Sequence, residues 1–303
     1  MAGGHVVPIM TRVRLSLVLA SMLCMVTALV AVPGAAVGAA DAHPIRPGVQ
    51  MITEGAQCTG NFEFKDKAGH VYIGMAAHCA GKGDSSDTNG CTTASYPLGT
   101  KVQFVVGSNL FDGGTLVGTG TLRYSSWLAM HQAKTKDENA CDYNDLALVR
   151  VDKKYLSRVS PTVPIIGGPV GFAKAFPPVG ATVYSVGSSS MRGSTEAKTG
   201  SVTARSSWTM TVRTGSPGVP GDSGSGFMGP NGGAIGVLST LDLFPDTGAN
   251  GVGSLYREVV FARSHGVPGL RLIHGAKFTG QQPVGASTAG LGGLLGGLGG
   301  LLG

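Results

Sequence analysis

Three short segments of the chain carry residues that can together perform nucleophilic catalysis. His78 follows Met-Ala-Ala, Asp145 precedes Leu-Ala-Leu-Val, and Ser223 lies in a Gly-Asp-Ser-Gly stretch. A serine hydroxyl is a poor nucleophile at neutral pH unless a neighbouring base takes its proton. Histidine suits that task because its pKa lies near neutrality, and a buried carboxylate can fix the imidazole tautomer and stabilise the cation that forms. The three residues are therefore a candidate triad for acyl transfer.

Each of the three has an ordinary structural alternative when it is taken alone. His78 can be a packed histidine, Asp145 a turn residue, and Gly-Asp-Ser-Gly a chance arrangement in a chain with 50 glycines. A motif stays a hypothesis until its context agrees. Here the chain order is histidine, aspartate, serine, and Cys79 directly follows the histidine.

The elements that must position these residues are predicted to be short strands. Only 13% of the residues are charged and aromatic residues are few, which favours a β-rich fold over a helical bundle. From about 45 to 267, apolar stretches alternate with Gly, Ser, Pro, Asn and Asp, which predicts the strands of a barrel or sandwich. The strands are expected at 71–75, 101–106, 146–151, 181–186, 209–213 and 234–238. One late helix is predicted at 255–264, before Gly266 and Pro268, and 80–96 is predicted to be a surface loop.

The two ends of the chain differ from this middle part. Arg12 and Arg14 precede an apolar run at 15–32 and then small residues, so 1–42 is predicted to be a signal peptide of a secreted protein; an uncleaved membrane anchor is the alternative. Residues 276–303 form a Gly/Leu-rich tail, predicted to be flexible, with weak membrane or cell-envelope association as the alternative. The folded domain is expected at 45–275.

The cysteines and charges exclude several other classes of protein. Cys58, Cys79, Cys91 and Cys141 follow the signal segment, and an even number in an exported chain predicts two disulfides in one of three pairings. There is no CxxC or clustered Cys/His pattern, so no metal or other cofactor is expected. The net charge of +6 is scattered, which argues against nucleic-acid binding.

Together, these segments resemble the bacterial secreted branch of trypsin-like serine proteases, the streptogrisin and α-lytic type. The resemblance runs from about Ile45 to Val267 and also draws on the stretches 192–204 and 45–58. It implies an all-β, chymotrypsin-like fold with two six-stranded antiparallel β-barrels, a short C-terminal helix, and the active site between the barrels.

The resemblance also implies roles for single residues. Ser223 is the nucleophile, His78 the general base and acid, and Asp145 the orienting carboxylate. The backbone N–H groups of Gly221 and Ser223 form the oxyanion hole, and Ser239 bonds the triad carboxylate.

Further structural roles follow from the same resemblance. Cys58 pairs with Cys79, which leaves Cys91 with Cys141. Arg192 is expected to pair with the buried carboxylate of Asp222, as an internal cation in place of a newly cut N-terminal ammonium.

The sequence departs from the family around the specificity pocket, which we place at Pro217, Thr240 and Leu241. The usual Gly-Asp-Ser-Gly-Gly-Pro reads Gly-Asp-Ser-Gly-Ser-Gly, and the half that contains Ser223 has no cysteine. We predict a secreted, monomeric serine endopeptidase acting on protein or peptide substrates. The alternatives are a catalytically idle protease-fold binding protein and an envelope-associated protein.

Cleavage is expected after small or medium-sized apolar residues. Pro217 has no charge to hold Arg or Lys, Leu238 stands where some glutamate-specific relatives carry a histidine, and Thr240 and Leu241 narrow the pocket mouth. A peptide-library profile measures this preference directly. A profile dominated by Arg, Lys, Asp or Glu would contradict it.

Overall fold

The structure is a computed structural model that describes residues 42–83, 87–193, 195–242 and 248–280, except for the side chains of Leu241 and Asp242. The predicted signal peptide up to residue 41, and the part of the predicted tail from residue 281, lie outside these residues. None of the helices within them is long and apolar enough to cross a membrane.

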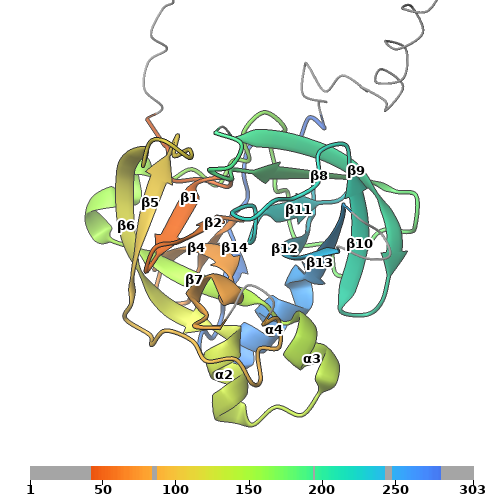
Figure 1. Ribbon diagram of the computed structural model, residues 1–303, viewed down its shortest axis with the longest axis horizontal. Coiled ribbons are helices and arrows are strands. Elements are labelled where there is room, and N and C mark those ends of the chain that lie inside the picture. The colour runs from red at the N-terminus through yellow and green to blue at the C-terminus, as the bar shows by residue number, and fades with distance from the viewer. Residues whose placement is uncertain (1–41, 84–86, 194, 243–247, 281–303) are drawn as a thin grey trace, which may run out of the picture. The chain divides into compact units, whose positions relative to one another are not determined.

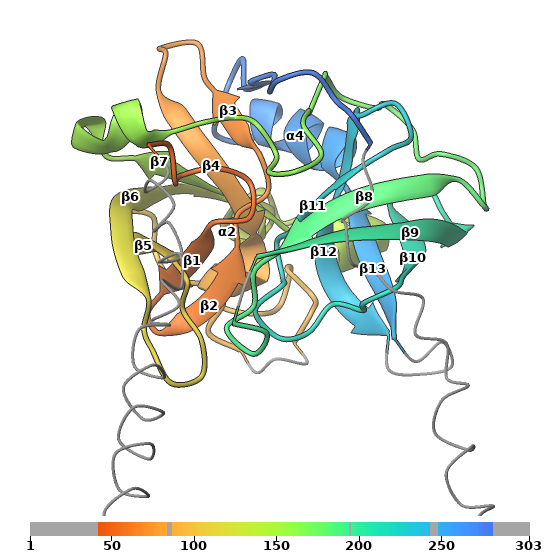
Figure 2. The same ribbon diagram turned by 90° about the horizontal axis from the view of Figure 1, so that it is seen from above.

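The named strands pair antiparallel and form two sheets that lie side by side in both views (Figures 1 and 2). The first is an eight-stranded sheet in the order β14-β3-β4-β7-β6-β5-β1-β2. Its strands are β1 (Gln50–Thr53), β2 (Ala56–Thr59), β3 (Glu63–Lys65), β4 (Val71–Ala76), β5 (Lys101–Val106), β6 (Thr115–Ser125), β7 (Leu146–Val151) and β14 (Arg271–Leu272).

The second sheet closes into a six-stranded barrel in the order β10-β13-β12-β11-β8-β9. Its strands are β8 (Thr182–Gly187), β9 (Glu196–Arg205), β10 (Thr209–Thr214), β11 (Gly226–Met228), β12 (Ala234–Asp242) and β13 (Ala249–Ser254). The predicted all-β, chymotrypsin-like fold is confirmed, and this sheet is one of the two expected six-stranded barrels. The first sheet differs from the expectation, since its hydrogen-bonded order is open and β14 from the C-terminal end extends it beside β3.

Helices lie between and after the strands. The single predicted late helix is present as α4 (Leu255–Ser264), and it buries Leu255, Glu258, Val259 and Ala262 at helical spacing. Two further helices, α2 (Ser126–Ala133) and α3 (Glu138–Tyr143), were not predicted from the sequence. Two 3₁₀ helices follow β4 and β7, at Ala77–Ala80 and Lys153–Arg158.

The hairpin of β1 and β2 sets the register of the strand that later faces the site. Glu54 and Gly55 connect the two strands, and both have positive φ angles, 48° and 90°. A two-residue turn of this kind matches the right-handed twist of its strands. The turn places Cys58 opposite Met51 and leaves β2 at the edge of the first sheet.

Two disulfides join segments of the first half of the chain. Cys58 bonds to Cys79, and Cys91 bonds to Cys141 of α3, which is the pairing that the resemblance implied. The second bond closes a separation of 50 residues. In the chain-entropy model a loop of that length restricts the unfolded chain by about 4 kcal/mol.

Replacement of both Cys91 and Cys141 by alanine is expected to lower the free energy of unfolding by about 4 kcal/mol. The reason is the loss of the restriction on the unfolded chain, and urea denaturation without reductant measures it. Peptide mapping under the same conditions checks the pairing. An unchanged unfolding midpoint would contradict the expectation.

Candidate active site

His78 and Asp145 meet because the strands before and after them pair. In the antiparallel register of β4 and β7, Ala76 lies opposite Leu146. The residues just beyond that pair must then approach one another, and the Ala77 N–H donates to the Asp145 carbonyl oxygen at 3.0 Å. His78 stands on the 3₁₀ helix that follows β4.

The carboxylate of Asp145 is buried and accepts three hydrogen bonds. Oδ1 accepts from the His78 backbone N–H at 2.8 Å, and Oδ2 lies 2.7 Å from His78 Nδ1. Ser239 Oγ on β12 donates to the same Oδ2 at 2.6 Å. Because an ionised carboxylate only accepts, Nδ1 carries the proton and Nε2 is left with its lone pair. The imidazole is thus oriented as a base.

The pKa of His78 reflects two opposing effects. Burial lowers it, whereas the negative charge of Asp145 and the hydrogen bond to that carboxylate raise it, and the net pKa lies above the ordinary 6.5. About a quarter of the His78 side chain stays exposed. The ring can therefore exchange a proton with a group in front of it.

Ser223 lies on the loop 217–225, and the edge strand β2 holds this loop against the histidine segment. The Thr59 N–H donates to the Ser223 carbonyl oxygen at 2.8 Å, and Thr59 Oγ1 donates to the Gly221 carbonyl oxygen at 2.8 Å. A side-chain carbon at Gly224 would lie 2.6 Å from the Thr59 carbonyl oxygen and 2.8 Å from the Ala76 nitrogen. Glycine at 224 thus allows the loop to approach the end of β4, two residues before His78. Among the described residues, no hydrogen bond joins Ser223 to His78.

The predicted oxyanion-hole groups lie on the same loop. Gly221 has a φ of +96°, which glycine adopts without strain. Its carbonyl oxygen accepts from Gln57 Nε2 at 3.1 Å as well as from Thr59. Within the part of the chain that the structure describes, the N–H groups of Gly221 and Ser223 donate to no other group, so both remain able to bind an anionic oxygen.

The predicted pairing of Arg192 with Asp222 is wrong, because Lys198 takes that place. Lys198 Nζ lies 2.6 Å from Asp222 Oδ2, and both side chains are buried. The remaining contacts of the Asp222 carboxylate come from the N–H groups of Ser189 and Val219. An unpaired buried carboxylate is costly, so the pair fixes the residue that directly precedes Ser223.

Arg192 lies near this pair but outside it. Its guanidinium donates to Ser216 Oγ and to the Pro217 carbonyl oxygen, and it lies 3.2 Å from the Glu196 carboxylate. The physical reason for the error is strand geometry. Lys198 shares a face of β9 with Val202, which is part of the barrel core, whereas Arg192 precedes the strand. The sequence did contain a signal for Lys198. It lies an even number of positions from the core residue Val202, so both point to the same face of the strand, and an inward-pointing lysine needs a buried partner.

The predicted specificity residues lie at the start of this loop and on β12. Pro217 packs beside Gly248, where an added side-chain carbon would lie 3.2 Å from Pro217 Cγ. Thr240 approaches Gly251 of β13 more closely still, since an added side-chain carbon there would collide with Thr240 Oγ1. Its neighbour Leu241 is on β12, but its side chain lies outside the described residues.

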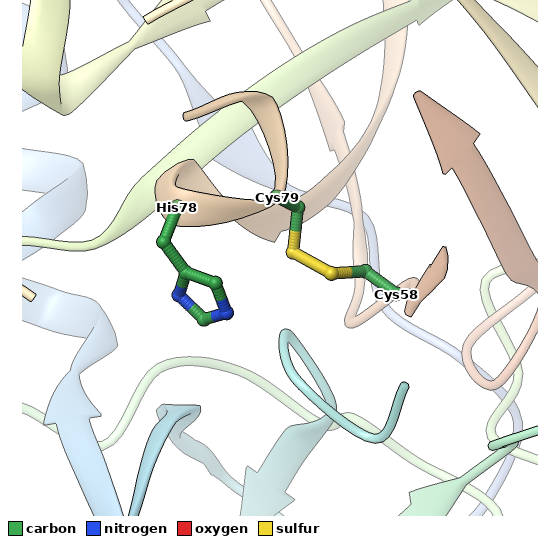
Figure 3. Close-up of side chains that lie close together, drawn as sticks. All are labelled: Cys58, His78 and Cys79. Atoms are coloured by element: carbon green, nitrogen blue, oxygen red, sulfur yellow. A yellow bond between two sulfur atoms is a disulfide. The ribbon is translucent and has the colours of Figure 1, made fainter. Parts of the chain in front are cut away.

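The disulfide beside the histidine also has the spacing of a metal site. Ligand atoms of Cys58, His78 and Cys79 lie within 4.8 Å of one another, and Figure 3 shows His78 and Cys79 on the same short helix, with the disulfide running from Cys79 to Cys58. Both sulfurs are bonded to each other, and a metal would require free thiolates. The two cysteines therefore form a disulfide and not a metal site.

Three residues that contact this site were absent from the sequence predictions. Gln57 and Thr59 hold the 217–225 loop, and Glu258 of α4 accepts a hydrogen bond from the Asp145 N–H at 3.1 Å. Gln57 and Thr59 flank the predicted disulfide cysteine Cys58, which was the only hint to them. A carboxylate among the apolar positions of a predicted helix was the hint to Glu258.

Comparison with known proteins gives similar solved structures. Neither a scan of protein-family models nor a search of curated proteins found a match. Several solved structures that resemble this chain are proteases. A Nocardiopsis protease is 20% identical, with 75% of this chain and 98% of that chain covered and a TM-score of 0.44. A Thermobifida fusca protease is 16% identical, with 76% and 98% covered and a TM-score of 0.46. A Cellulomonas bogoriensis chymotrypsin is 19% identical, with 76% and 98% covered and a TM-score of 0.45.

Replacement of Lys198 by methionine is expected to lower stability by about 3–5 kcal/mol, because it leaves the buried Asp222 charge without its partner. Thermal unfolding measures the loss. Arg192→Met is the matched control, and its smaller effect follows from its more exposed position, since its side chain is 27% exposed and that of Lys198 is 4% exposed. Equal losses in the two variants would contradict the assignment of Lys198.

Proposed function

We propose that this protein is a secreted serine endopeptidase that hydrolyses peptide bonds through an acyl-enzyme on Ser223. The observation that carries the proposal is the set of bonds around Asp145, which leaves His78 Nε2 as a free base beside the loop that bears Ser223. Serine, histidine and aspartate in these roles perform acyl transfer on several unrelated folds.

The proposed reaction has two halves. Ser223 Oγ attacks the carbonyl carbon of the scissile bond while His78 Nε2 takes the hydroxyl proton, and the N–H groups of Gly221 and Ser223 stabilise the oxyanion. His78 then gives its proton to the leaving amine. Water, activated by the same imidazole, attacks the ester and releases the acid product and the free Ser223 hydroxyl.

The disulfides support the proposal that the protein is exported, because such bonds persist in oxidising compartments. The buried ion pair supports activity without a newly cut N-terminus. The Ile45 N–H donates to the Arg158 carbonyl oxygen at 3.1 Å, and the Asp222 carboxylate already has Lys198 as its cationic partner. In this proposal the chain needs no N-terminal ammonium at Ile45 to order the 217–225 loop.

A catalytically idle binding protein is the second candidate. The observation in its favour is that no hydrogen bond joins Ser223 to His78 in the described residues. Catalytic hydrogen bonds are often long before substrate binds, so this observation does not separate the two candidates. A fluorophosphonate probe does separate them, since it labels an activated Ser223 in the wild type and should leave Ser223→Ala unlabelled. An unlabelled wild-type protein would favour the binding protein.

Substitutions of the triad are expected to act as one unit. Ser223→Ala and His78→Ala should each lower kcat by about 10⁶-fold and Asp145→Asn by about 10⁴-fold, with the double variants no worse than the stronger single one. Wild-type activity should rise with pH through a midpoint above 6.5, because only neutral His78 accepts a proton and Asp145 raises its pKa. Peptide hydrolysis across pH measures both effects. Near wild-type turnover by Ser223→Ala would exclude this site.

A further inference from the structure

Glu258 is the one carboxyl of α4, and it lies directly behind Asp145. Its side chain is fully buried. Oε1 accepts a hydrogen bond from the Asp145 backbone N–H at 3.1 Å, and Oε2 has no hydrogen-bond partner among the described residues. The approach is close, since a side-chain carbon at Gly253 would lie 2.9 Å from Oε1. The absence of a side chain at Gly253 thus leaves room for the Glu258 carboxyl group behind the proposed triad.

Apart from the Asp145 N–H, the described surroundings of Glu258 offer no positive charge to compensate a negative one. The titratable groups that face it are Asp145 and the buried Tyr124 of β6, and both are neutral or anionic. Four further buried polar atoms also have no hydrogen-bond partner in the described part of the chain: Tyr124 Oη, Ser125 Oγ, and Asn144 Oδ1 and Nδ2. The region behind Asp145 is therefore polar, and the groups named here bring no positive charge to it.

The elements packed against α4 supply no cation either. His131 of α2 and Arg257 of α4 itself are exposed, and Arg263 of α4 donates to the Leu270 carbonyl oxygen at 2.8 Å. The charge of Arg150 on β7 opposes the rise in the pKa of Tyr72. The described side chains of β12 and β13 include no ionisable group. An ionised Glu258 would thus face Asp145 alone, which is a costly arrangement of two like charges.

Burial raises the pKa of Glu258 well above its ordinary value, and the hydrogen bond from the Asp145 N–H lowers it less. The negative charge of Asp145 raises the pKa further. Two like charges in contact favour protonation of one member. Asp145 accepts hydrogen bonds from His78 and Ser239, so the proton belongs on Glu258.

We propose that Glu258 is a positioning residue of the active site, a neutral carboxylic acid that holds the Asp145 backbone without adding a second negative charge behind His78. This inference rests on the proposed function. The neutral acid keeps Oε1 as an acceptor for the Asp145 N–H, and it leaves the Asp145 charge to act on the imidazole alone. An ionised Glu258 would add to that charge and raise the pKa of His78 further.

The kinetic test compares two replacements of the same residue. Glu258→Leu removes the acceptor and is expected to lower kcat by about 10- to 100-fold with little change in KM, since small displacements of catalytic groups have effects of that size. Glu258→Gln keeps an acceptor oxygen without charge and is expected to rescue most of that loss, with the acid limb of the pH profile in place. A Glu258→Gln enzyme as slow as Glu258→Leu, or one whose acid limb moves to lower pH, would overturn the proposal.

The control is Glu63→Gln in β3. Glu63 is also fully buried with a raised pKa. Its backbone pairs with β4 and accepts from the Ile273 N–H just after β14, and the charge that acts on its carboxyl is that of Arg46 rather than that of Asp145. This substitution is expected to leave hydrolysis unchanged. A loss in Glu63→Gln equal to that in Glu258→Leu would show that any buried carboxyl matters equally, and would overturn the assignment.

A second measurement does not depend on catalysis. In Ser223→Ala protein, a carboxyl that binds its proton more tightly when folded makes the free energy of unfolding fall as pH rises above the ordinary 4.5. Addition of Glu258→Gln to Ser223→Ala removes this loss. The difference in urea midpoint between the double variant and Ser223→Ala should therefore grow in favour of the double variant as pH rises above 4.5. A pH-independent difference overturns the neutral acid. A wild-type protein without activity overturns the proposed function, whereas a flat difference in an active enzyme overturns only the assignment of Glu258.

Discussion

The compensation of the buried Asp145 carboxylate is the interaction on which the rest of the site depends. A carboxylate this deep is stable only if donors surround it. The β4–β7 pairing brings His78 to it, β12 of the barrel brings Ser239, and α4 brings Glu258 to its backbone. The first sheet, the barrel and the C-terminal helix therefore meet at one charge. The imidazole takes its orientation because its Nδ1–H is one of the donors that this charge requires.

A second buried carboxylate, Asp222, plays the same part for the loop that bears Ser223. Its partner Lys198 comes from the barrel, whereas Thr59, which holds the loop from the other side, comes from the first sheet. Each half of the molecule thus fixes the residues of the other. The geometry of the two N–H groups on the loop follows from this arrangement, because the backbone between two fixed points has little freedom.

Much of the fold and the central residues could be predicted from the sequence, because periodic apolar stretches and three short motifs are local signals. The six strands predicted by position and α4 lay where the pattern placed them, and His78 and Asp145 met as expected. The identity of the Asp222 partner could not be read in the same way. Arg192 and Lys198 are both cations near Gly and Ser. They differ in position, because Lys198 lies on β9 with its side chain buried, whereas Arg192 precedes the strand and is more exposed. Glu258 likewise contacts Asp145 across 113 residues, a separation that no local pattern encodes.

The β1–β2 hairpin carries three consecutive residues with separate duties. Gln57 holds the Gly221 carbonyl, Cys58 bonds to the neighbour of His78, and Thr59 holds the Ser223 backbone. Successive strand residues point to opposite faces, so a one-residue slip would exchange all three faces at once. The tip at Glu54 and Gly55 should thus resist changes of length, and at Gly55, with its φ of +90°, most changes of residue type as well. In an evolving lineage, insertions and deletions in this short loop would be removed, and the glycine at its second position would be kept.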